Sequence, residues 1–378
     1  MNIIIGGDIV PTKSNNELFV NGEAEKLVGK EILKIFNNSD LSILNLETPL
    51  CDKDNPILKC GPNLRASTDT IKGLSKINSS FYTLANNHIM DHGVAGLKST
   101  IDILKSNNIN FAGVGDNLSN INKYFIYNKK NKKIGIYCCA EHEFSIATQD
   151  SPGVNPFDPL VSLDEIDELK DICDYLIVLY HGGKEHYRFP TPILQQRCRK
   201  MIEKGADLIV CQHSHCIGCF EDWQGGKIVY GQGNFLFDDG DNEFWNTSLL
   251  INLKIDNNIE IEYIPIVKNK NCVDIAVGEE KQKIIKDFKK RSEMIKKDQF
   301  VIDNFNKFSD EIIYMYLSNI TYGINKTFIF RVFNKLSNNK LLKYYLQKKY
   351  NKMRKSGLLN YFQGEPHNEI IINGLRRF

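Results

Sequence analysis

Residues that could hold a metal ion or transfer a proton occur in five short clusters, each of which follows an apolar, β-type run. Two clusters carry a carboxylate, one carries two carboxamides beside a histidine, and two carry histidines. In chain order they are Gly7-Asp8, Asn45-Leu46-Glu47, Asn86-Asn87-His88 with Asp91, His181-Gly182-Gly183 and His213-Ser214-His215. Carboxylate, amide and imidazole groups are oxygen and nitrogen ligands that suit Mn, Fe, Zn or Mg. The sequence therefore predicts a site for a divalent metal of undetermined identity.

Short strands must position these clusters. The β-type runs are Asn2–Ile5, Leu41–Leu44, Phe81–Ala85, Tyr175–Tyr180 and Asp207–Cys211. In an open α/β sheet the carboxyl ends of the strands form one rim, so residues far apart in the sequence meet there. We therefore predict that the six metal-capable residues converge in one pocket: Asp8, Glu47, Asn87, His181, His213 and His215.

Each cluster also has an ordinary interpretation. Asp8 could cap a helix or form a turn, as aspartates after strands often do. Glu47 is harder to explain in that way, because it ends an apolar run at Thr48-Pro49 and is well placed to bridge two cations. His213 and His215 are two residues apart, so in an extended segment both side chains would point the same way. Surface histidines in a turn are the alternative, and a zinc site with nearby Cys211, Cys216 and Cys219 is another.

Proton transfer has its own candidates. If the Asn87 carboxamide binds metal, the adjacent His88 stays free to act as an acid or base, with Asp91 in the same cluster. Glu185 and His186 follow His181 closely and could act on a bound substrate, or they could be solvated loop residues. The chain has no Gly-x-Ser-x-Gly motif, which argues against a serine hydrolase of the usual kind. Its Gly231–Phe235 loop lacks the Lys-Ser/Thr of a phosphate-binding loop, so we do not expect nucleotide binding there.

The length and the charge distribution predict two domains. A chain of 378 residues corresponds to roughly two domains of about 150 residues each. Residues 281–378 hold 21 Lys and Arg against 8 Asp and Glu, whereas residues 1–280 hold 27 against 38. We place the boundary near residue 275, which gives a domain over 1–275 and a basic, mainly helical region over 276–378.

The basic region suggests a class of partner. Residues 312–364 contain ten Lys or Arg and no acid, interleaved with Phe328, Phe330, Phe333, Tyr344, Tyr345 and Tyr350. This composition fits an anionic polymer or small-molecule precursor, a membrane surface or a polymer-assembly complex, and an ordinary solvated helix face is the alternative. We expect no nucleic acid as partner. Without a signal peptide or a membrane-spanning run, we expect a cytoplasmic protein, with contact to the membrane periphery as a further hypothesis.

The remaining patterns predict an α/β fold with a mostly parallel sheet. Apolar residues recur at helical spacing over Ala24–Phe36 and Val94–Leu104. Two antiparallel hairpins are expected, one over Ile121–Tyr137 and one that joins Thr247–Ile255 to Ile259–Val267. After residue 277 the pattern is helical.

Taken together and in order, the motifs resemble the capsule-synthesis CapA family, also called the poly-γ-glutamate capsule (PGA_cap) domain, within the calcineurin-like metallophosphoesterase superfamily. The resemblance runs from Asn2 to about Asp238. The matching segments are Gly7-Asp8, Asn45–Thr48, Leu84–Gly93, Thr100 with Leu104, His181–Glu185, Gly205–Val210, His213–His215 and Tyr230–Phe235.

The resemblance implies a four-layer αββα sandwich, here followed by a helical appendage. It assigns Asp8 and His215 to one metal, and Asn87, His181 and His213 to the other, with Glu47 where an aspartate usually bridges. His88 would take the place of the histidine that protonates the leaving group. The first motif of the superfamily is usually Asp-x-His, and Val10 stands here at the position of that histidine, so we expect only one tightly bound metal.

The function implied is metal-dependent hydrolysis of a phosphoester or amide bond in a capsule or cell-surface polymer or its precursor. Two alternatives remain open. One is a non-catalytic partner of a polymer-assembly complex, and the other is a metal-independent acid–base enzyme such as an epimerase that uses His88, Glu185 or His186.

Overall fold

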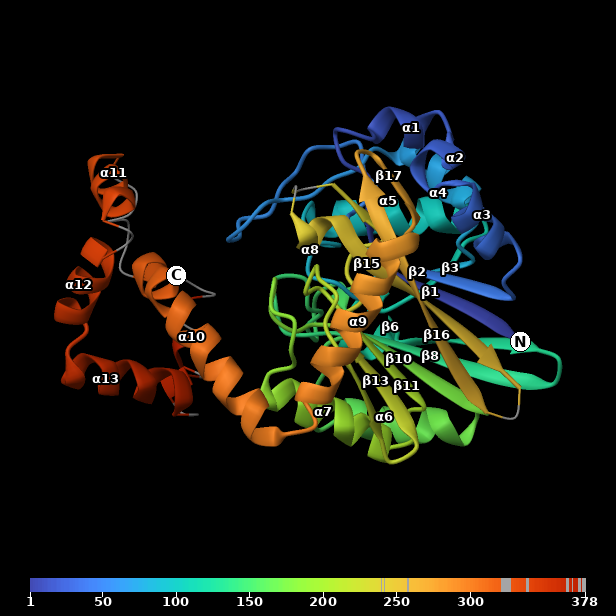
Figure 1. Cartoon of the computed structure of the whole chain (residues 1–378). Helices are drawn as coiled ribbons and strands as arrows, with labels where there is room; N and C mark the ends of the chain where they lie inside the picture. The colour runs from blue at the N-terminus through green and yellow to red at the C-terminus, as the bar shows by residue number, and fades with distance from the viewer. Residues whose placement is uncertain are drawn as a thin grey trace. The chain divides into compact units, whose positions relative to one another are not determined.

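The structure is a computed structural model of the chain, and its contacts divide it into two compact units, Met1–Ile302 and Asp303–Phe378. All the strands of the described residues lie in the first unit (Figure 1). The described residues are 1–238, 240, 242–256, 258–320, 328–337, 340–364, 367–368, 370–372 and 375, without the side chains of 319 and 328–331.

The first sheet has parallel strands at one side and antiparallel strands at the other. Its order is β17-β16-β15-β1-β2-β3-β4, and β14 also pairs with β1. The strands β1 to β4 are parallel, whereas β15, β16 and β17 follow one another as antiparallel neighbours. Their bounds are β1 Asn2–Val10, β2 Leu41–Leu46, β3 Phe81–Thr83, β4 Asn110–Ala112, β14 Leu236–Phe237, β15 Thr247–Ile255, β16 Ile259–Asn269 and β17 Cys272–Ile275.

The second sheet has the order β12-β13-β11-β10-β8-β7. Its four central strands are parallel and both edge strands are antiparallel, so the predicted parallel arrangement holds for the centre of this sheet and not for its edges. A small sheet is formed by β6, β5 and β9. The bounds are β5 Val114–Gly115, β6 Ile121–Asn122, β7 Tyr124–Lys129, β8 Lys132–Ala140, β9 Gly153–Val154, β10 Tyr175–His181, β11 Leu208–Gln212, β12 Phe220–Trp223 and β13 Gly226–Tyr230.

The alternation of side chains along β10 defines the layers. Ile177 and Leu179 belong to the apolar core shared with the first sheet, whereas Leu176 and Val178 belong to the core shared with α6 and α7. The helices α1 to α5 lie on the other side of the first sheet (Figure 1). The predicted four-layer αββα fold is therefore confirmed. The helices are α1 Asn16–Val20, α2 Ala24–Leu27, α3 Lys30–Asn37, α4 Ile71–Ile77, α5 Gly93–Ser106, α6 Ser162–Asp171, α7 Pro192–Glu203 and α8 Glu243–Asn246, with 3-10 turns η1 Thr68–Thr70 and η2 Leu118–Asn120.

The C-terminal part of the chain is helical among the described residues. Its helices are α9 Gly278–Met294, α10 Asp298–Ile320, α11 Phe328–Leu336, α12 Lys340–Lys349 and α13 Lys352–Gln363. The predicted boundary near residue 275 falls between β17 and α9, whereas the compact units divide after Ile302. The difference arises because α9 packs on the first unit, where Phe288 contacts Phe220 and Tyr263. None of the helices that the structure describes combines the length and the apolar character needed to cross a bilayer.

Two local predictions can be compared with the structure. The helix expected over Ala24–Phe36 is interrupted between α2 and α3, at Gly29 with a φ of 36°. A Cβ at Gly29 would lie 1.8 Å from Asp274 Oδ1, so the chain turns here to pass close to β17. Both hairpins are confirmed, and the first turns at Lys130 and Asn131, two residues with left-handed backbone angles.

The first strand is longer than predicted, and Asp8 lies within it. The pairing of β1 with β2 shifts in register between Ile5 and Asp8, where Gly6 and Gly7 stand. A Cβ at Gly7 would lie only 2.0 Å from the Gly233 carbonyl oxygen. The glycine pair therefore lets the 233–235 segment approach the strand just before Asp8, and the Phe235 amide donates to the Asp8 carbonyl over 2.9 Å.

Candidate metal centre

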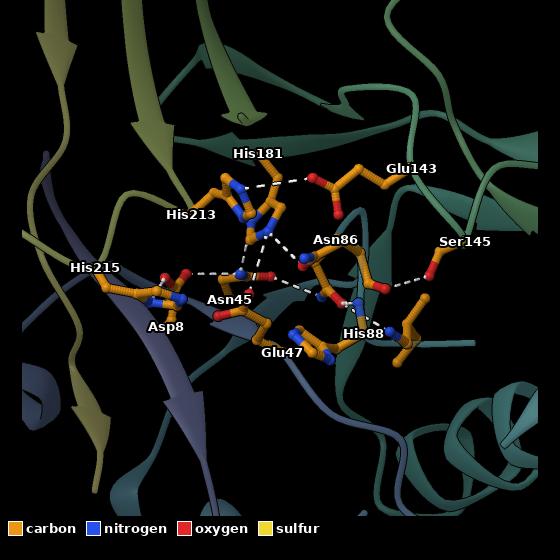
Figure 2. A network of polar contacts seen from close by, with 12 residues as sticks. Asp8, Asn45, Glu47, Asn86, His88, Glu143, Ser145, His181, His213 and His215 are labelled. Carbon is orange, nitrogen blue, oxygen red and sulfur yellow. Dashed lines mark hydrogen bonds and ion pairs between the residues drawn. The ribbon is translucent and has the colours of Figure 1, made fainter. Parts of the chain in front are cut away.

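The six predicted metal ligands converge at the rim where the two sheets meet. Figure 2 shows five of them close together. Asp8 comes from β1, Glu47 and Asn87 follow β2 and β3, and His181 ends β10. The remaining two, His213 and His215, follow β11, and all six side chains are buried.

Their donor atoms form two groups that share one carboxylate. Glu47, His181 and His213 make up the first group, and Asp8, Glu47 and His215 make up the second. Within each group the candidate ligand atoms all lie within 4.8 Å of one another. Among the described residues these are the only two groups of three or more His, Cys, Asp or Glu side chains arranged in this way.

Asn87 belongs with the first group by its contacts. Its Oδ1 lies 3.0 Å from His181 Nε2, and Glu47 Oε1 lies 3.3 Å from the same nitrogen. The amide oxygen, the carboxylate and the imidazole thus face one another. An amide oxygen adds a ligand without adding charge.

Several buried polar atoms in this cluster have no hydrogen-bond partner among the described residues. Neither oxygen of Glu47 has a hydrogen-bond partner among the described residues, and the same holds for Nδ1 of His213. An unpaired buried carboxylate is costly, since it gives up its hydration without a compensating contact. A divalent cation between the donor groups would satisfy these atoms, so the residues fit such a metal.

Burial shifts the protonation equilibria of the same residues. Burial first, and then the charge of Asp8, raise the pKa of the Glu47 carboxyl well above its usual range. Burial first, and then the neighbouring His181 and His215, lower the pKa of His213 well below its usual range. Burial also lowers the pKa of His181. Neutral imidazoles are the form that binds metal.

Two further asparagines hold the ligands in place. Asn45 Nδ2 donates to Asp8 Oδ1 over 2.7 Å and lies 3.2 Å from His181 Nδ1. Asn86 Nδ2 donates to Asn45 Oδ1 over 3.0 Å, and Asn86 Oδ1 accepts from the amides of His88 and Ile89. This chain of carboxamides links ligands from both sheets (Figure 2). It fixes their orientation in the way that hydrogen bonds behind a metal site commonly do.

His88 belongs to neither donor group, and its ring lies against a carboxylate and a lysine. Its Nδ1 lies 2.6 Å from Asp91 Oδ2, and because a carboxylate only accepts, Nδ1 is the donor of this pair. The side chain of Lys59 pairs with the other Asp91 oxygen, and Lys59 Nζ lies 3.2 Å from His88 Nδ1. Nε2 is therefore the ring nitrogen left to exchange a proton at the rim, where His88 lies beside Glu47 (Figure 2).

The two histidines of the His-Ser-His segment do not lie in extended backbone, and this prediction was wrong. Their φ angles of 85° and 53° are both left-handed, a conformation that side-chain-bearing residues adopt uncommonly and that often marks functional sites. The two side chains consequently diverge into different donor groups, with ring centroids 6.1 Å apart. The His215 ring stacks on Trp245 at 4.8 Å, and its Nδ1 lies 2.8 Å from Asn234 Oδ1.

The remaining predicted residues lie outside the donor groups. Glu185 and His186 are exposed, although the His186 ring lies 6.2 Å from the His215 ring, between centroids. Cys211, Cys216 and Cys219 are buried, and neither donor group among the described residues includes a cysteine. The zinc alternative with cysteine ligands is thus not supported. Val10, which stands where the related pattern has a histidine, is a buried strand residue.

Sequence reasoning missed Lys59, Glu143 and Asn234. Lys59 comes from the long irregular segment between β2 and η1, and Glu143 lies 3.7 Å from His213 Nε2. No periodic sequence pattern indicates that either residue reaches the site. Asn234 lies in the Gly231–Phe235 segment. The closely spaced glycines of that segment could have indicated that its backbone approaches another part of the chain.

These observations define a class: a layered α/β protein with a candidate centre for divalent metal at its rim. Residues 2–239 match the sequence model of the family described as bacterial capsule synthesis protein PGA_cap. The chain belongs to this family, as its motifs predicted.

Known relatives cover only part of the chain. The capsule biosynthesis protein CapA of Bacillus anthracis is 31% identical over 244 residues, which are 62% of this chain and 59% of that protein. The PGA biosynthesis protein CapA of Bacillus subtilis (strain 168) is 33% identical over 211 residues, 54% of this chain and 55% of its own length. The chain thus spans between a half and two thirds of these relatives.

Solved structures show a partial likeness. A phosphatase from Mycoplasma pneumoniae aligns with a TM-score of 0.46 and 16% identity, over 71% of this chain and 94% of its own. The layers of the present fold are defined by the chain's own strand order and core contacts.

Proposed function

We propose that this protein is a metal-dependent hydrolase that cleaves a phosphoester or amide bond in a cell-surface polymer or in a precursor of one. The observation that carries the proposal is the pair of donor groups that share Glu47, a carboxylate with no hydrogen-bond partner among the described residues. The substrate class is supported by the relatives, which are named for capsule and PGA biosynthesis.

Asp8, Glu47 and His215 would hold one cation, and Glu47, Asn87, His181 and His213 the other. A divalent cation in this position supplies Lewis acidity, which lowers the pKa of water from about 15.7 towards 7 and stabilises negative charge in the transition state. Asn45 keeps Asp8 and His181 oriented through its carboxamide. The chain's own contribution is a buried set of ligands held by hydrogen bonds from neighbouring carboxamides.

His88 would donate a proton to the leaving group through Nε2. Asp91 holds the imidazole in the required tautomer by accepting from Nδ1, and Lys59 balances the charge of Asp91. General acid catalysis of this kind contributes typically about 10²- to 10⁴-fold in rate. His88 is next to a ligand in the sequence but outside both donor groups, so it can transfer a proton without giving up a cation.

A second candidate is a non-catalytic partner in a polymer-assembly complex. The observation in its favour is Val10, a buried aliphatic residue where the related pattern has a ligand, which leaves the Asp8 group with three protein ligands. In that case the rim would shape a binding groove and no bond would be cleaved.

Metal analysis combined with an assay panel separates the two candidates. The purified protein is assayed for phosphatase, phosphodiesterase and γ-glutamyl hydrolase activity with added Mn, and its metal content is measured. We expect Glu47→Ala to lose both bound metal and activity. The control is Glu260→Ala, which removes an exposed carboxylate from β16.

Each outcome favours one candidate. Activity that survives in Glu47→Ala would contradict the hydrolase proposal, and so would a protein that binds no metal when metal is in excess. Bound metal without any activity on the panel would favour the non-catalytic partner.

A further inference from the structure

The second unit carries positive charge that nothing in the described chain neutralises. Residues 312–364 contain ten Lys or Arg and no Asp or Glu. Eight of these cations have described side chains, and none of the eight forms an ion pair with a carboxylate of the described residues. They are Lys335, Lys340, Lys343, Lys348, Lys349, Lys352, Arg354 and Lys355. A concentration of unpaired cations favours an anionic partner.

Helix α13 concentrates cations at its less favourable end. Lys352, Arg354 and Lys355 occupy its first turn, which contains no acidic residue. The dipole of a helix favours negative charge at the N-terminus, so cations are disfavoured there. Arg354 donates to the Lys349 carbonyl over 2.9 Å, but Lys352 and Lys355 are exposed. The stability of the helix therefore does not explain this charge pattern, whereas an external anion would.

Among the described residues of the same unit, more large apolar side chains are exposed than buried. Its described core is small, with Leu342, Leu346 and Tyr350 buried. The exposed set includes Phe333 at 58%, Leu336 at 76%, Met353 at 84%, Leu359 at 54%, Tyr361 at 50% and Phe362 at 57%. Apolar surface on this scale, interleaved with cations, typically marks a binding surface.

Lysine and tyrosine side chains are paired along α12. Lys348 Nζ lies 4.7 Å from the centre of the exposed Tyr344 ring, and Lys349 Nζ lies 5.9 Å from that of Tyr345. Each pair is four residues apart on one helix face. Amphipathic rings beside lysines suit the headgroup level of a bilayer, where one end of the side chain is wet and the other apolar.

We propose that the second unit binds the surface of membranes that contain anionic lipids, with its cations at the headgroups and its exposed apolar side chains in the interface. An acidic polymer would neutralise the cations but leave the apolar side chains in water, whereas an anionic bilayer accommodates both. The proposal does not depend on hydrolytic activity or on metal binding at the rim.

The test measures binding of the full-length protein to vesicles by co-sedimentation. Vesicles of phosphatidylglycerol and phosphatidylcholine are compared with vesicles of phosphatidylcholine alone, at low and high salt. We expect binding only to the anionic vesicles, and we expect it to weaken steeply as salt screens the cations. Soluble poly-γ-glutamate is added in a parallel experiment to determine whether the polymer itself is bound.

Two variants and one control assign the binding to this unit. Lys352→Gln/Arg354→Gln/Lys355→Gln should lower the vesicle partition coefficient about a hundredfold, since each basic side chain near an anionic surface contributes about a factor of five. Leu359→Ser/Phe362→Ser should lower it at least about tenfold through loss of apolar insertion. The control Lys281→Gln/Lys286→Gln/Lys289→Gln removes three exposed cations from α9 and should bind as well as the parent.

The proposal is overturned by several results. These are equal binding to both vesicle types, absence of binding at low salt, and a control that loses binding as much as the α13 variant. Binding of poly-γ-glutamate without binding of vesicles would identify an acidic polymer as the partner. Circular dichroism of each variant establishes that the helices are retained, so a loss of binding is not a loss of folding.

Discussion

At the residue scale, Glu47 determines how the candidate centre responds to pH and metal. Its pKa is raised by burial and by Asp8, so without metal its ionisation opposes folding. A group whose folded pKa is raised contributes stability below its unfolded pKa and loses that contribution as pH rises through the folded pKa. The histidines act in the opposite sense. Their lowered pKa values make stability fall as pH drops below about 6.5.

We therefore expect Glu47→Gln to be more stable than the parent protein when metal is removed. The difference should grow as pH rises and reach about 1–3 kcal/mol, the typical cost of an unsatisfied buried group. Denaturant unfolding with chelator at several pH values measures it. Both proteins keep His181 and His213, so the effect of these histidines cancels in the comparison. A difference that shrinks with rising pH would contradict the assignment.

Val10 provides a second test at this scale. The Glu47, Asn87, His181 and His213 group has four protein ligands, whereas the Asp8, Glu47 and His215 group has three and leaves positions open to water. We expect about one tightly held metal per chain, and activity that rises on addition of Mn. Val10→His should raise the retained metal towards two. Two tight equivalents in the unaltered protein, measured by elemental analysis, would show that this ligand count is wrong.

His88 should affect turnover and not metal content. His88→Ala removes the proton donor but no member of either donor group, so we expect a drop of about 10²- to 10⁴-fold in kcat with retained metal unchanged. Asp91→Asn should lower kcat through loss of the orienting carboxylate. Loss of metal from His88→Ala would make His88 a ligand and remove the acid role.

The site residues were accessible to sequence reasoning because the sheet rim gathers the ends of strands. Glu47 and the three histidines follow or end buried strands and Asp8 lies near the end of one, and this regularity predicted their convergence. Lys59 reaches the site from a segment without periodic structure, so no sequence pattern could place it. The left-handed backbone at His213 and His215 was also beyond prediction, because it depends on tertiary contacts of an irregular segment.

At the element scale, close approaches between segments explain why some predicted elements differ from the observed ones. The long helix expected from Ala24 is divided because Gly29 packs against Asp274, about 245 residues away in the sequence. The two hairpins were predicted correctly because their sequence patterns are local, with β-type runs on both sides of a short polar turn. Local patterns thus predicted element types well, while boundaries followed contacts that are remote in the chain.

Gly7 is the element-scale feature with the sharpest expected consequence. In Gly7→Ala the new methyl group would meet the Gly233 carbonyl oxygen at 2.0 Å, and a rotamer change could not relieve this contact because the position of each atom is fixed by the backbone. We expect destabilisation of about 1–3 kcal/mol, and metal retention lowered by displacement of Asp8. Thermal unfolding and metal analysis measure both effects. Unchanged stability would show that β1 and the segment at Gly233 can move apart without cost.

At the scale of the whole molecule, the candidate metal centre and the basic segment lie in different units. The donor groups, the carboxamide network and the His88 pair all lie within Met1–Ile302, while the eight described cations of residues 312–364 that form no ion pair lie within Asp303–Phe378. The net charge of +2 conceals this division. Charge counts along the sequence predicted a boundary near residue 275, whereas the compact units divide after Ile302.

A truncation after Ile302 should therefore keep the metal centre. We expect the shortened protein to retain the metal content of the full chain and its activity on small substrates, and to lose binding to anionic vesicles. Elemental analysis and the vesicle assay, with the full-length protein beside it, measure the two properties. Loss of metal on truncation would indicate that the second unit supports the rim.

Because the two donor groups share Glu47, the affinity of one group for a cation should depend on whether the other group is occupied. A cation in one half neutralises the carboxylate on which the other half depends, so the second cation meets a weaker field and a like charge. Binding should then be negatively cooperative, with a titration in two separated steps. Linkage requires the effect to be mutual, so a cation in either donor group would lower the affinity of the other group by the same factor. Occupancy would become a graded function of metal supply, so that a cell's free metal concentration sets how much of the protein carries two ions.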